Sequence, residues 1–505
     1  MLFKKTMVAA GVSAVVLGLS ACGSSDSGSN GTSAATVPHE IQSEAAPATE
    51  TDVFFGGNTD TDSSGSITYL VVAESGVAFQ PDAELQGLTL EGVGSGTTIS
   101  HVQILGSEDD GIEWFGGAVD VDHIVINGQD DDGLDFDDGY RGNVSYAIVR
   151  MNDTDGDTGI EADTRGSAED PVNGIESSPN LSYVTVLGNI GKSKSTKGAN
   201  FKQGFAGKMY RSVFIDDSVN TVAAGGFDGN CIDIDDTLDA NLAMIDTVCA
   251  TAMPTFTGDS AGLEAFKISA NNDMSDTTTS TINVTTLAVT SDVALDATMP
   301  AGIDDNAWVG AVDPTTASPW WDGWTVHLAN DTGSLKNVNF NPLAAEIADG
   351  TITPATVHAC PAGTSKGAET FVSIEGASFP VCLLQHMVGD VTYSLTNDHV
   401  YMLSNYIKVG NGGVQDALPA NVDASILNIQ AGTQIFAQTG AQAGIRVTRG
   451  AEINVNGTAA MPVIMSAATF DLGSGTITGG TDYTGRGDWG GLVVNGYAKT
   501  NSLDN

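Results

Sequence analysis

Basic residues are scarce in this sequence: 19 Lys and Arg stand against 63 Asp and Glu, so the formal net charge is −44 over 505 residues. A field of that sign makes nucleic acid a poor partner, because it repels phosphates. The sequence also lacks a phosphate-binding glycine loop, a Ser/His/Asp set and a zinc-ligand spacing among its 7 histidines. Strong acidity has a plain explanation too, namely solubility in a salty, calcium-bearing medium.

Long hydrophobic runs are absent except for one near the start, from residue 7 to residue 19. It follows Lys4 and ends in Leu19-Ser20-Ala21-Cys22, an arrangement that resembles a bacterial lipoprotein signal. The resemblance implies cleavage before Cys22, lipidation of that residue, and location at the outer membrane or cell surface. A transmembrane helix is the alternative, for which the run is short. Residues 23–51, rich in small polar residues, are expected to form a flexible tether.

Cysteine is equally scarce. Besides Cys22 there are four cysteines, which fall into two local pairs, Cys231 with Cys249 and Cys360 with Cys382. An exported chain meets oxidising conditions, so we expect disulfides rather than a metal site. Pairing within each local pair is the most economical of three connectivities, and the sequence alone leaves the choice open.

The sequence is rich in one repeat. Eight positions recur with similar residues 22 residues later: His101, Gly106, Asp110, Gly111, Ile112, Glu113, Trp114 and Gly117 are matched by His123, Gly128, Asp132, Gly133, Leu134, Asp135, Phe136 and Gly139. Related signatures begin at Gly87, Gly159 and Gly198. Short strands broken at glycines with this period predict an all-β fold, a right-handed parallel β-helix with coils of about 22 residues. The leucine-rich repeat, which shares the period, is excluded because its leucine pattern is absent.

Strand alternation predicts where the side chains of the repeat point. If Ile112 and Trp114 point inward, Glu113 points outward, and the next coils add further residues to its row. The expected row is Thr89, Glu113, Asp135, Glu161 and Asn200. Like charges stacked at the strand spacing are unfavourable unless they are solvated or bridged by a cation.

Acidic turns adjoin this row, and carboxylate oxygens on successive coils suit calcium. The expected calcium ligands are Asp109, Asp110, Glu113, Asp130, Asp131, Asp132, Asp135, Asp137 and Glu161. Their spacing does not match an EF-hand loop, and a solvated acidic face is the alternative. In register with the repeat, Lys197 and Lys202 replace Asp132 and Asp137, which predicts charge compensation between neighbouring rows.

The rest of the chain divides into three parts. The acidic β-helix is expected to span residues 52–330, with a short helix at 239–252 and a tryptophan-rich end that caps the open coil or, alternatively, offers a sugar platform. Residues 331–384 are expected to be a linker or cap segment with a disulfide, and 385–505 a second β-helical segment. That segment ends on an uncapped coil. It therefore folds back onto the first helix, docks head-to-tail on a neighbour, or is truncated; fold-back is favoured.

Several motifs resemble a group of secreted or lipid-anchored bacterial β-helix proteins. The resemblance rests on residues 88–98 and 110–117, and on Gly432-Thr433, Arg449-Gly450-Ala451 and Gly487-Asp488-Trp489-Gly490-Gly491. In that group the second set of motifs precedes the first, whereas here it follows. The resemblance implies fold and location, and hardly any chemistry.

Parallel β-helices also include polysaccharide hydrolases and lyases. Paired acids flanking a water could serve a hydrolase, but the Gly-His-Gly and Arg-Ile-Lys motifs of the polygalacturonase-like family are missing. A calcium-dependent lyase needs a base beside the carboxylates, for which Arg141 and Lys202 are candidates near Asp131 and Asp135. The sequence favours a calcium-stabilised structural or adhesive binding module whose partner is a polysaccharide or another cell-surface component. A polysaccharide lyase or hydrolase is the alternative, and no catalytic residue is assigned.

Overall fold

The computed structural model describes most of the chain beyond residue 38. The described residues are 39–43, 46, 50, 53–80, 83–151, 156–164, 174–188, 196–216, 230–235, 241–250, 256–257, 261–268, 272–276, 280–283, 285–295, 297–326, 342–471, 476–478, 483 and 485–501. Contacts divide the chain into Met1–Thr36 and Val37–Asn505, and every described residue belongs to the second unit. The expected signal peptide, including Cys22, lies outside the described residues. No helix among the described residues is long and apolar enough to cross a membrane.

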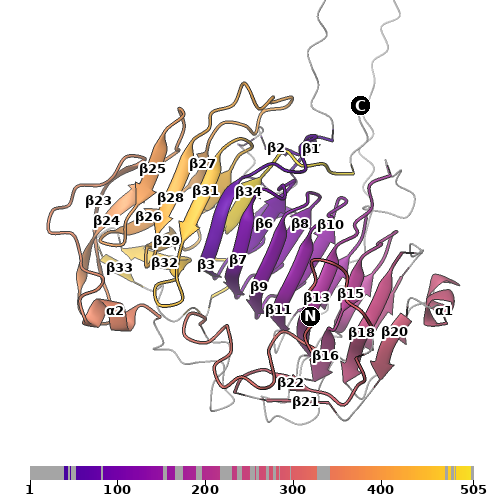
Figure 1. Ribbon diagram of the computed structural model, residues 1–505. Helices are drawn as coiled ribbons and strands as arrows, with labels where there is room; N and C mark the ends of the chain where they lie inside the picture. Colours follow the sequence, from indigo (N-terminus) through magenta and orange to yellow (C-terminus); the bar gives the residue numbers. More distant parts are fainter. Residues whose placement is uncertain are drawn as a thin grey trace, which may run out of the picture. The chain divides into compact units, whose positions relative to one another are not determined.

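One parallel sheet, which we call the signature sheet, carries the repeated residues (Figure 1). Its ten strands are, in spatial order, β27 (Tyr406–Val409), β30 (Gly444–Val447), β34 (Leu492–Asn495), β6 (Leu88–Glu91), β8 (Ile112–Phe115), β10 (Leu134–Asp137), β12 (Thr158–Ala162), β14 (Lys197–Phe201), β17 (Asn230–Ile234) and β19 (Phe256–Thr257). The register joins Leu88 to Ile112, Ile112 to Leu134, and Leu134 to Ile160. These are the pairs that the signature spacing predicts, so the parallel β-helix is confirmed.

The other walls of the helix are built from longer strands. They are β3 (Gly65–Ala73), β7 (Thr98–Leu105), β9 (Asp120–Asn127), β11 (Asn143–Arg150), β13 (Asn180–Gly188), β15 (Lys208–Tyr210) with β16 (Val213–Asp216), β18 (Ala243–Ala250) and β20 (Asn272–Asp276). In the C-terminal coils two separate strands replace each long one: β25 (Thr392–Leu395), β28 (Ile426–Gln430) and β31 (Glu452–Asn456) on one wall, and β24 (Ser378–Leu384), β26 (Val400–Leu403), β29 (Gln434–Gln438) and β32 (Val463–Asp471) on the other. These strands stack in parallel from coil to coil.

Antiparallel pairs and two helices complete the fold. The pairs are β1 (Ile41–Gln42) with β2 (Phe54–Phe55), β4 (Ala78–Gln80) with β5 (Ala83–Glu84), β21 (Thr281–Ile282) with β22 (Val289–Thr290), β23 (Thr364–Val372) with β24, and β33 (Thr476–Thr478) with β32. The helices are α1 (Ala261–Lys267) and α2 (Ala344–Ala348). The helix expected at 239–252 is wrong for its described part, because β18 occupies 243–250 and pairs with β15 and β16.

The interior is one continuous apolar cluster that includes Ile112 and Trp114, as the alternation predicts. It also takes in Leu263 and Phe266 from α1, which follows the last strand of the signature sheet in sequence. Figure 1 places α1 beyond β20, at the end of the strand series. An apolar helix face therefore covers that end of the core.

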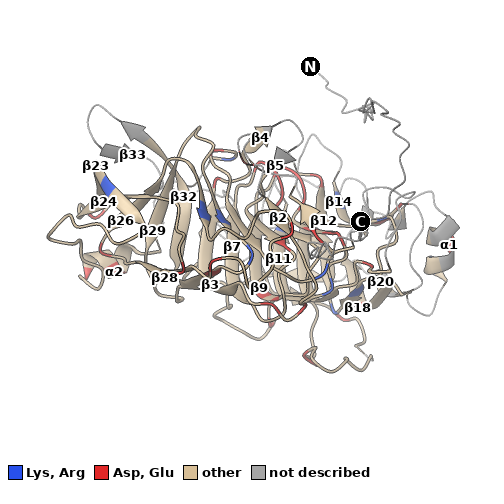
Figure 2. Ribbon diagram, turned by 90° about the horizontal axis from the view of Figure 1, so that it is seen from above, with Lys and Arg blue, Asp and Glu red and all other residues tan. Residues whose placement is uncertain are grey.

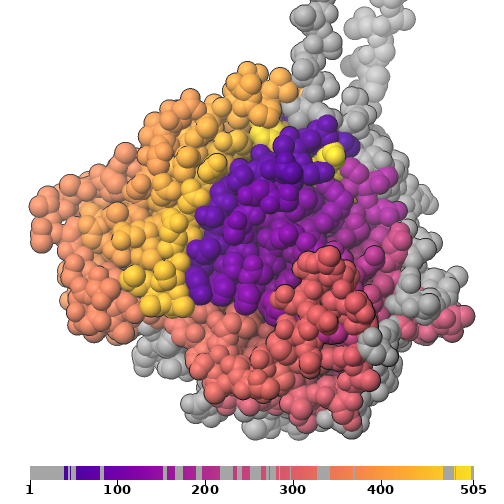
Figure 3. Space-filling view, viewed as in Figure 1, coloured from indigo at the N-terminus to yellow at the C-terminus, as the bar shows by residue number. Residues whose placement is uncertain are grey.

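The C-terminal coils stack on the N-terminal ones within the same chain. Strand β34 pairs with β6, joining Leu492 to Leu88, and β3 pairs with β31 through its first half and with β32 through its second. Figure 3 shows the yellow C-terminal surface directly beside the indigo N-terminal one. This is the fold-back arrangement, and we call the junction of β34, β31 and β32 with β6 and β3 the seam.

The tryptophan-rich segment lies along a side wall and not over a coil end. Trp321 is buried against outward-facing residues of the long strands, including Val125 and Ile148. Trp324 is fully buried beside the wall formed by β3 and β7. The coral-coloured segment in Figure 3 accordingly covers part of the strand wall. The capping prediction is wrong for these residues, and burial of Trp321 and Trp324 also removes them from any sugar platform.

Part of the expected tether is bound to the coils. Glu40 forms an ion pair with buried Arg449 at 2.7 Å, and Glu50 pairs with Lys408 at 2.5 Å. The Ser43 hydroxyl accepts a hydrogen bond from Arg446 at 3.0 Å. The described residues between 39 and 55 thus form a strap across the C-terminal coils. It is held there by ion pairs between its acidic side chains and basic side chains of the coils.

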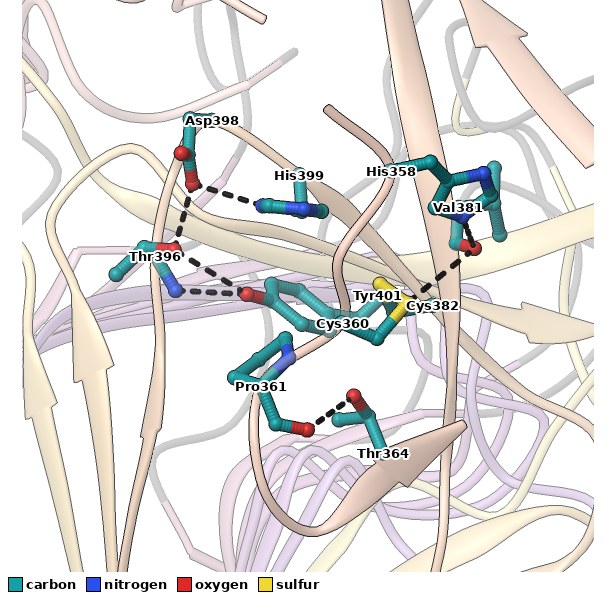
Figure 4. The surroundings of a disulfide bond; sticks show 10 residues. All are labelled: His358, Cys360, Pro361, Thr364, Val381, Cys382, Thr396, Asp398, His399 and Tyr401. Carbon is teal, nitrogen blue, oxygen red and sulfur yellow. Dashed lines mark hydrogen bonds and ion pairs between the residues drawn. A yellow bond between two sulfur atoms is a disulfide. The ribbon is translucent and has the colours of Figure 1, made fainter. Parts of the chain in front are cut away.

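Both expected disulfides are present, each within a local pair: Cys231 with Cys249 and Cys360 with Cys382. Figure 4 shows the second one beside His358 and Val381, whose carbonyl accepts a hydrogen bond from the His358 ring at 2.7 Å. The bond closes a loop with a sequence separation of 22.

Replacing both Cys360 and Cys382 with serine should lower the free energy of unfolding by about 2–4 kcal/mol, because an open loop of this size adds entropy to the unfolded chain. Urea unfolding of the variant and the parent checks this. Reduction of the parent breaks both disulfides and should therefore cost at least as much stability as the double substitution. Equal stability of variant and parent would show that the bond does not constrain the unfolded chain.

Candidate functional site

Two buried aspartates tie successive turns of the helix together. The Asp110 carboxylate accepts a hydrogen bond from the backbone N–H of Asp132 at 2.8 Å, and the Asp132 carboxylate accepts one from Thr158 at 2.7 Å. The turns approach closely because glycine follows each aspartate: a Cβ on Gly133 would lie 2.5 Å from the Gly159 carbonyl oxygen. The Asp-Gly pair of the signature is therefore explained by coil stacking.

The predicted row of the signature sheet exists, in the predicted order. Glu113 lies beside Thr89 and Asp135, Asp135 beside Glu161, and Glu161 beside Asn200. The row is far less solvated than a surface row, since Glu113 is 4% exposed and Asp135 8%. The solvated acidic face is thus wrong for these two residues. Acidic positions gather near β12 in Figure 2, whereas basic ones are few and scattered.

The turns and the row together form what we call the carboxylate ladder. Three sets of three residues each offer one oxygen within 4.8 Å of the others: Asp109, Asp110 and Asp131; Asp110, Glu113 and Asp135; and Asp132, Asp135 and Glu161. Seven of the nine expected calcium ligands are brought together in this way. The other two lie beside the ladder: Asp130 forms an ion pair with Arg486 at 3.0 Å, and Asp137 follows Asp135 two positions later in β10.

Burial and crowding disfavour the negative charges of the ladder. Burial, followed by the repulsion of neighbouring carboxylates, raises the pKa of Asp110, Asp132 and Asp135 well above the ordinary value. Asp163, directly after β12, has its pKa raised to about 11 by burial and by Asp137. Protons or a cation must therefore neutralise part of the ladder.

Among the described residues, lysine supplies that positive charge at one end of the ladder. Lys202 pairs with Glu161 at 2.9 Å and lies 3.7 Å from Asp163, while Lys197 pairs with Asp233 at 2.5 Å. Charge compensation between neighbouring rows is thus confirmed. Asn200 continues the row and donates its amide N–H to Glu161 at 3.0 Å.

The three carboxylate sets of the ladder also fit a hard divalent cation. All donors are carboxylate oxygens, which calcium prefers, and oxygens bound to one calcium at 2.3–2.6 Å lie within about 5 Å of each other. Asn200 adds a buried side-chain carbonyl oxygen that has no hydrogen-bond partner among the described residues. Calcium held by Asp110, Glu113 and Asp135, or by Asp132, Asp135 and Glu161, would supply the missing positive charge.

The arrangement suits a lyase less well. Burial alone would lower the pKa of Lys202, but its ion pair with Glu161 raises the pKa above the usual lysine value, which is opposite to the requirement for a general base. Arg141 pairs with Asp60 at 3.1 Å and also donates to backbone oxygens of Gly139 and Lys499. Both candidate bases are thus engaged in ion pairs with carboxylates.

Comparison with known families agrees with this geometry. The model of the pectate-lyase-like β-helix domain matches residues 17–325 and 394–505. The chain belongs to this family. The two matched stretches contain the two sets of coils that meet at the seam. No curated protein matches the chain, and no solved structure does. Membership of the pectate-lyase-like β-helix family establishes the coil architecture and is compatible with polysaccharide chemistry.

Sequence reasoning missed one further cluster in this family member. The cluster lies on β7 and β9, in a different sheet from the carboxylate ladder. It consists of His101, Asp122 and His123, each of which offers a ligand atom within 4.8 Å of the others. The 22-residue spacing of the two histidines was the available signal. A search for zinc spacings along the chain could not find it, because β7 and β9 bring the residues together only by stacking.

Proposed function

We propose that this chain is an exported, lipid-anchored β-helix protein that acts at the cell surface as a calcium-stabilised structural or adhesive binding module. The observation that carries the proposal is the carboxylate ladder. Its oxygens lie on successive coils, and within the described part of the chain lysine pairs with it at Glu161 alone. Calcium would neutralise the ladder and hold successive coils together. A polysaccharide or another cell-surface component is the proposed partner, because the charge of −44 opposes nucleic acid.

Calcium should raise Tm by several degrees, because an ion that binds only the folded chain adds about 2.7 kcal/mol at a concentration 100 times its Kd. Magnesium should act less, since it demands tighter octahedral geometry. The measurement is thermal unfolding of the metal-free protein against calcium, with isothermal titration calorimetry for stoichiometry.

Two variants make the calcium experiment specific. Asp135 belongs to two of the three sets, so Asp135→Asn should remove most of the calcium effect. In calcium-free buffer its Tm should be no lower than that of the parent, because the amide needs no proton to be neutral. Asp322→Asn changes an exposed aspartate outside the ladder and should leave both values unchanged. An unchanged Tm of the parent at millimolar calcium would contradict the proposal and leave a ladder neutralised by protons.

A calcium-dependent polysaccharide lyase or hydrolase is the second candidate, favoured by membership of the pectate-lyase-like family. A test of activity separates the enzyme from the binding module. The protein is incubated with pectate or alginate plus calcium, and products are measured by the absorbance of unsaturated ends and by reducing-end assays. Product formation that Asp135→Asn abolishes would establish the enzyme. Binding of the polymer without product would support the module.

The proposed anchor has its own test. Cys22→Ala should leave a soluble or uncleaved precursor, because the acyl chains of the modified cysteine provide the membrane affinity. Detergent phase partitioning of cells expressing the parent and the variant measures this. If the variant still partitions with the detergent, Cys22 is not the anchor.

A further inference from the structure

The side wall carries a column of aromatic rings at the bends of the long strands. Five successive strands bend at a residue with positive φ, at Tyr69, His101, His123, Tyr146 and Tyr183. Such a conformation is uncommon for residues other than glycine, and here the stacking of coils maintains it. The rings stack face to face, with centroids 4.3, 4.5, 5.0 and 5.1 Å apart in that order.

The bends of the column share one residue pattern, from which two neighbouring bends differ. Three bends consist of a hydroxyl residue followed by tyrosine: Thr68-Tyr69, Ser145-Tyr146 and Ser182-Tyr183. The two bends between them are Ser100-His101 and Asp122-His123. Tyrosine therefore satisfies the bend and the stacking, and neither requires histidine or aspartate. Both exceptions introduce metal-ligating side chains, and they occur on neighbouring strands.

Hydrogen bonds already link these groups. The Ser100 hydroxyl lies 2.6 Å from Nδ1 of His101 and donates to the Asp122 carboxylate at 2.7 Å. The same Asp122 oxygen contacts Nδ1 of His123. Solvent reaches the cluster, because the side chains of His123 and Asp122 are 27% and 47% exposed.

We propose that His101, Asp122 and His123 form a binding site for a divalent transition-metal ion of the Zn²⁺ or Cu²⁺ class. Two imidazole nitrogens and one carboxylate are a donor set that such ions take readily, with open positions left for water. Calcium prefers oxygen donors, so this site and the carboxylate ladder select different ions. The site is independent of the proposed function.

Binding requires one local movement. The two imidazoles are parallel within 5°, so lone pairs in the ring planes run side by side and do not converge on one point. Rotation of one ring about its terminal side-chain torsion, which is soft, turns its nitrogen towards Asp122. The ion would then replace the contact between Ser100 and His101. The purely structural alternative is that the histidines only support Trp320, whose ring meets that of His123 edge-on at 4.9 Å.

Trp320 makes a built-in reporter for the test. Cu²⁺ bound at the site should quench part of the tryptophan fluorescence. Zn²⁺, measured by calorimetry, should bind with one equivalent and be displaced by Cu²⁺, which binds such donors more tightly. Millimolar calcium should not compete. The column supplies matched substitutions: His101→Tyr and Asp122→Ser each restore the pattern found in neighbouring coils.

Each of these variants should keep the Tm of the metal-free parent and bind Zn²⁺ at least ten-fold more weakly. His386→Gln, which changes an exposed histidine on another part of the chain, should bind like the parent. The proposal is overturned if the parent takes up no Zn²⁺ below about 100 µM, or if both column variants bind as well as the parent. If one variant fails to fold, the other still decides between these outcomes.

Discussion

Replacing Arg446 with alanine should lower the free energy of unfolding by about 3–5 kcal/mol, because it leaves a buried carboxylate without its partner. Arg446 is fully buried on β30 and pairs at 2.6 Å with Glu91 on β6, which is 1% exposed. The pair spans β34, so it joins a C-terminal coil to an N-terminal one across the seam. Asn495 donates to the same Glu91 oxygen at 2.6 Å. Urea unfolding followed by circular dichroism measures the loss.

The matched control is Lys408→Ala on the neighbouring strand β27. Its ion pair with Glu50 joins side chains that are 22% and 23% exposed, so the loss should stay below about 1 kcal/mol. A double-mutant cycle adds Glu91→Gln, which should restore part of the stability of Arg446→Ala by removing the orphaned charge. If Arg446→Ala and Lys408→Ala cost the same, the seam does not depend on its buried ion pair.

The coil architecture could be predicted because one period dictates both strand pairing and side-chain direction. The register places Ile112, Leu134 and Ile160 at equivalent positions of successive coils, as their spacing requires. Fold-back could be favoured because the last coil has no cap and the linker of residues 331–384 keeps it close to the first helix. Local disulfide pairing was the most economical of three connectivities, and the structure decides for it.

Burial of the predicted row could not be read from alternation. Alternation gives the direction of Glu113 but not what packs around it, and the neighbouring Asp110 and Asp135 crowd it in space. The same limit explains the tryptophan segment. Sequence reasoning placed it at a coil end because it follows the last visible repeat. The outward-facing Val125 and Ile148 already offered an apolar side wall, which that segment covers.

The strap was missed for a related reason. Composition marks residues 23–51 as too polar for a core, and composition ignores where the few basic residues lie. Arg446, Arg449 and Lys408 occur within or beside the C-terminal strands, and acidic residues of the strap pair with two of them. Scarcity of positive charge thus also determines where an acidic segment binds.

The seam has an apolar anchor as well, and its removal should cost as much as that of the ion pair. Trp489, just before β34, is fully buried and donates its indole N–H to the Ala73 carbonyl at the end of β3, at 2.7 Å. Trp489→Ala should therefore lower the free energy of unfolding by about 3–5 kcal/mol, through the cavity and the lost apolar burial.

Replacing each of two buried tryptophans with phenylalanine separates the effect of packing from that of hydrogen bonding. Trp114 is also fully buried, stacked on Phe136 at 4.7 Å, yet its indole N–H has no hydrogen-bond partner among the described residues. Trp489→Phe loses a bond, whereas Trp114→Phe removes an unsatisfied donor that costs about 1–3 kcal/mol when buried. Trp489→Phe should thus be the more destabilising by at least about 1 kcal/mol in urea unfolding. Equal losses would mean that the bond to Ala73 does not hold the seam, and that the anchor acts through packing alone.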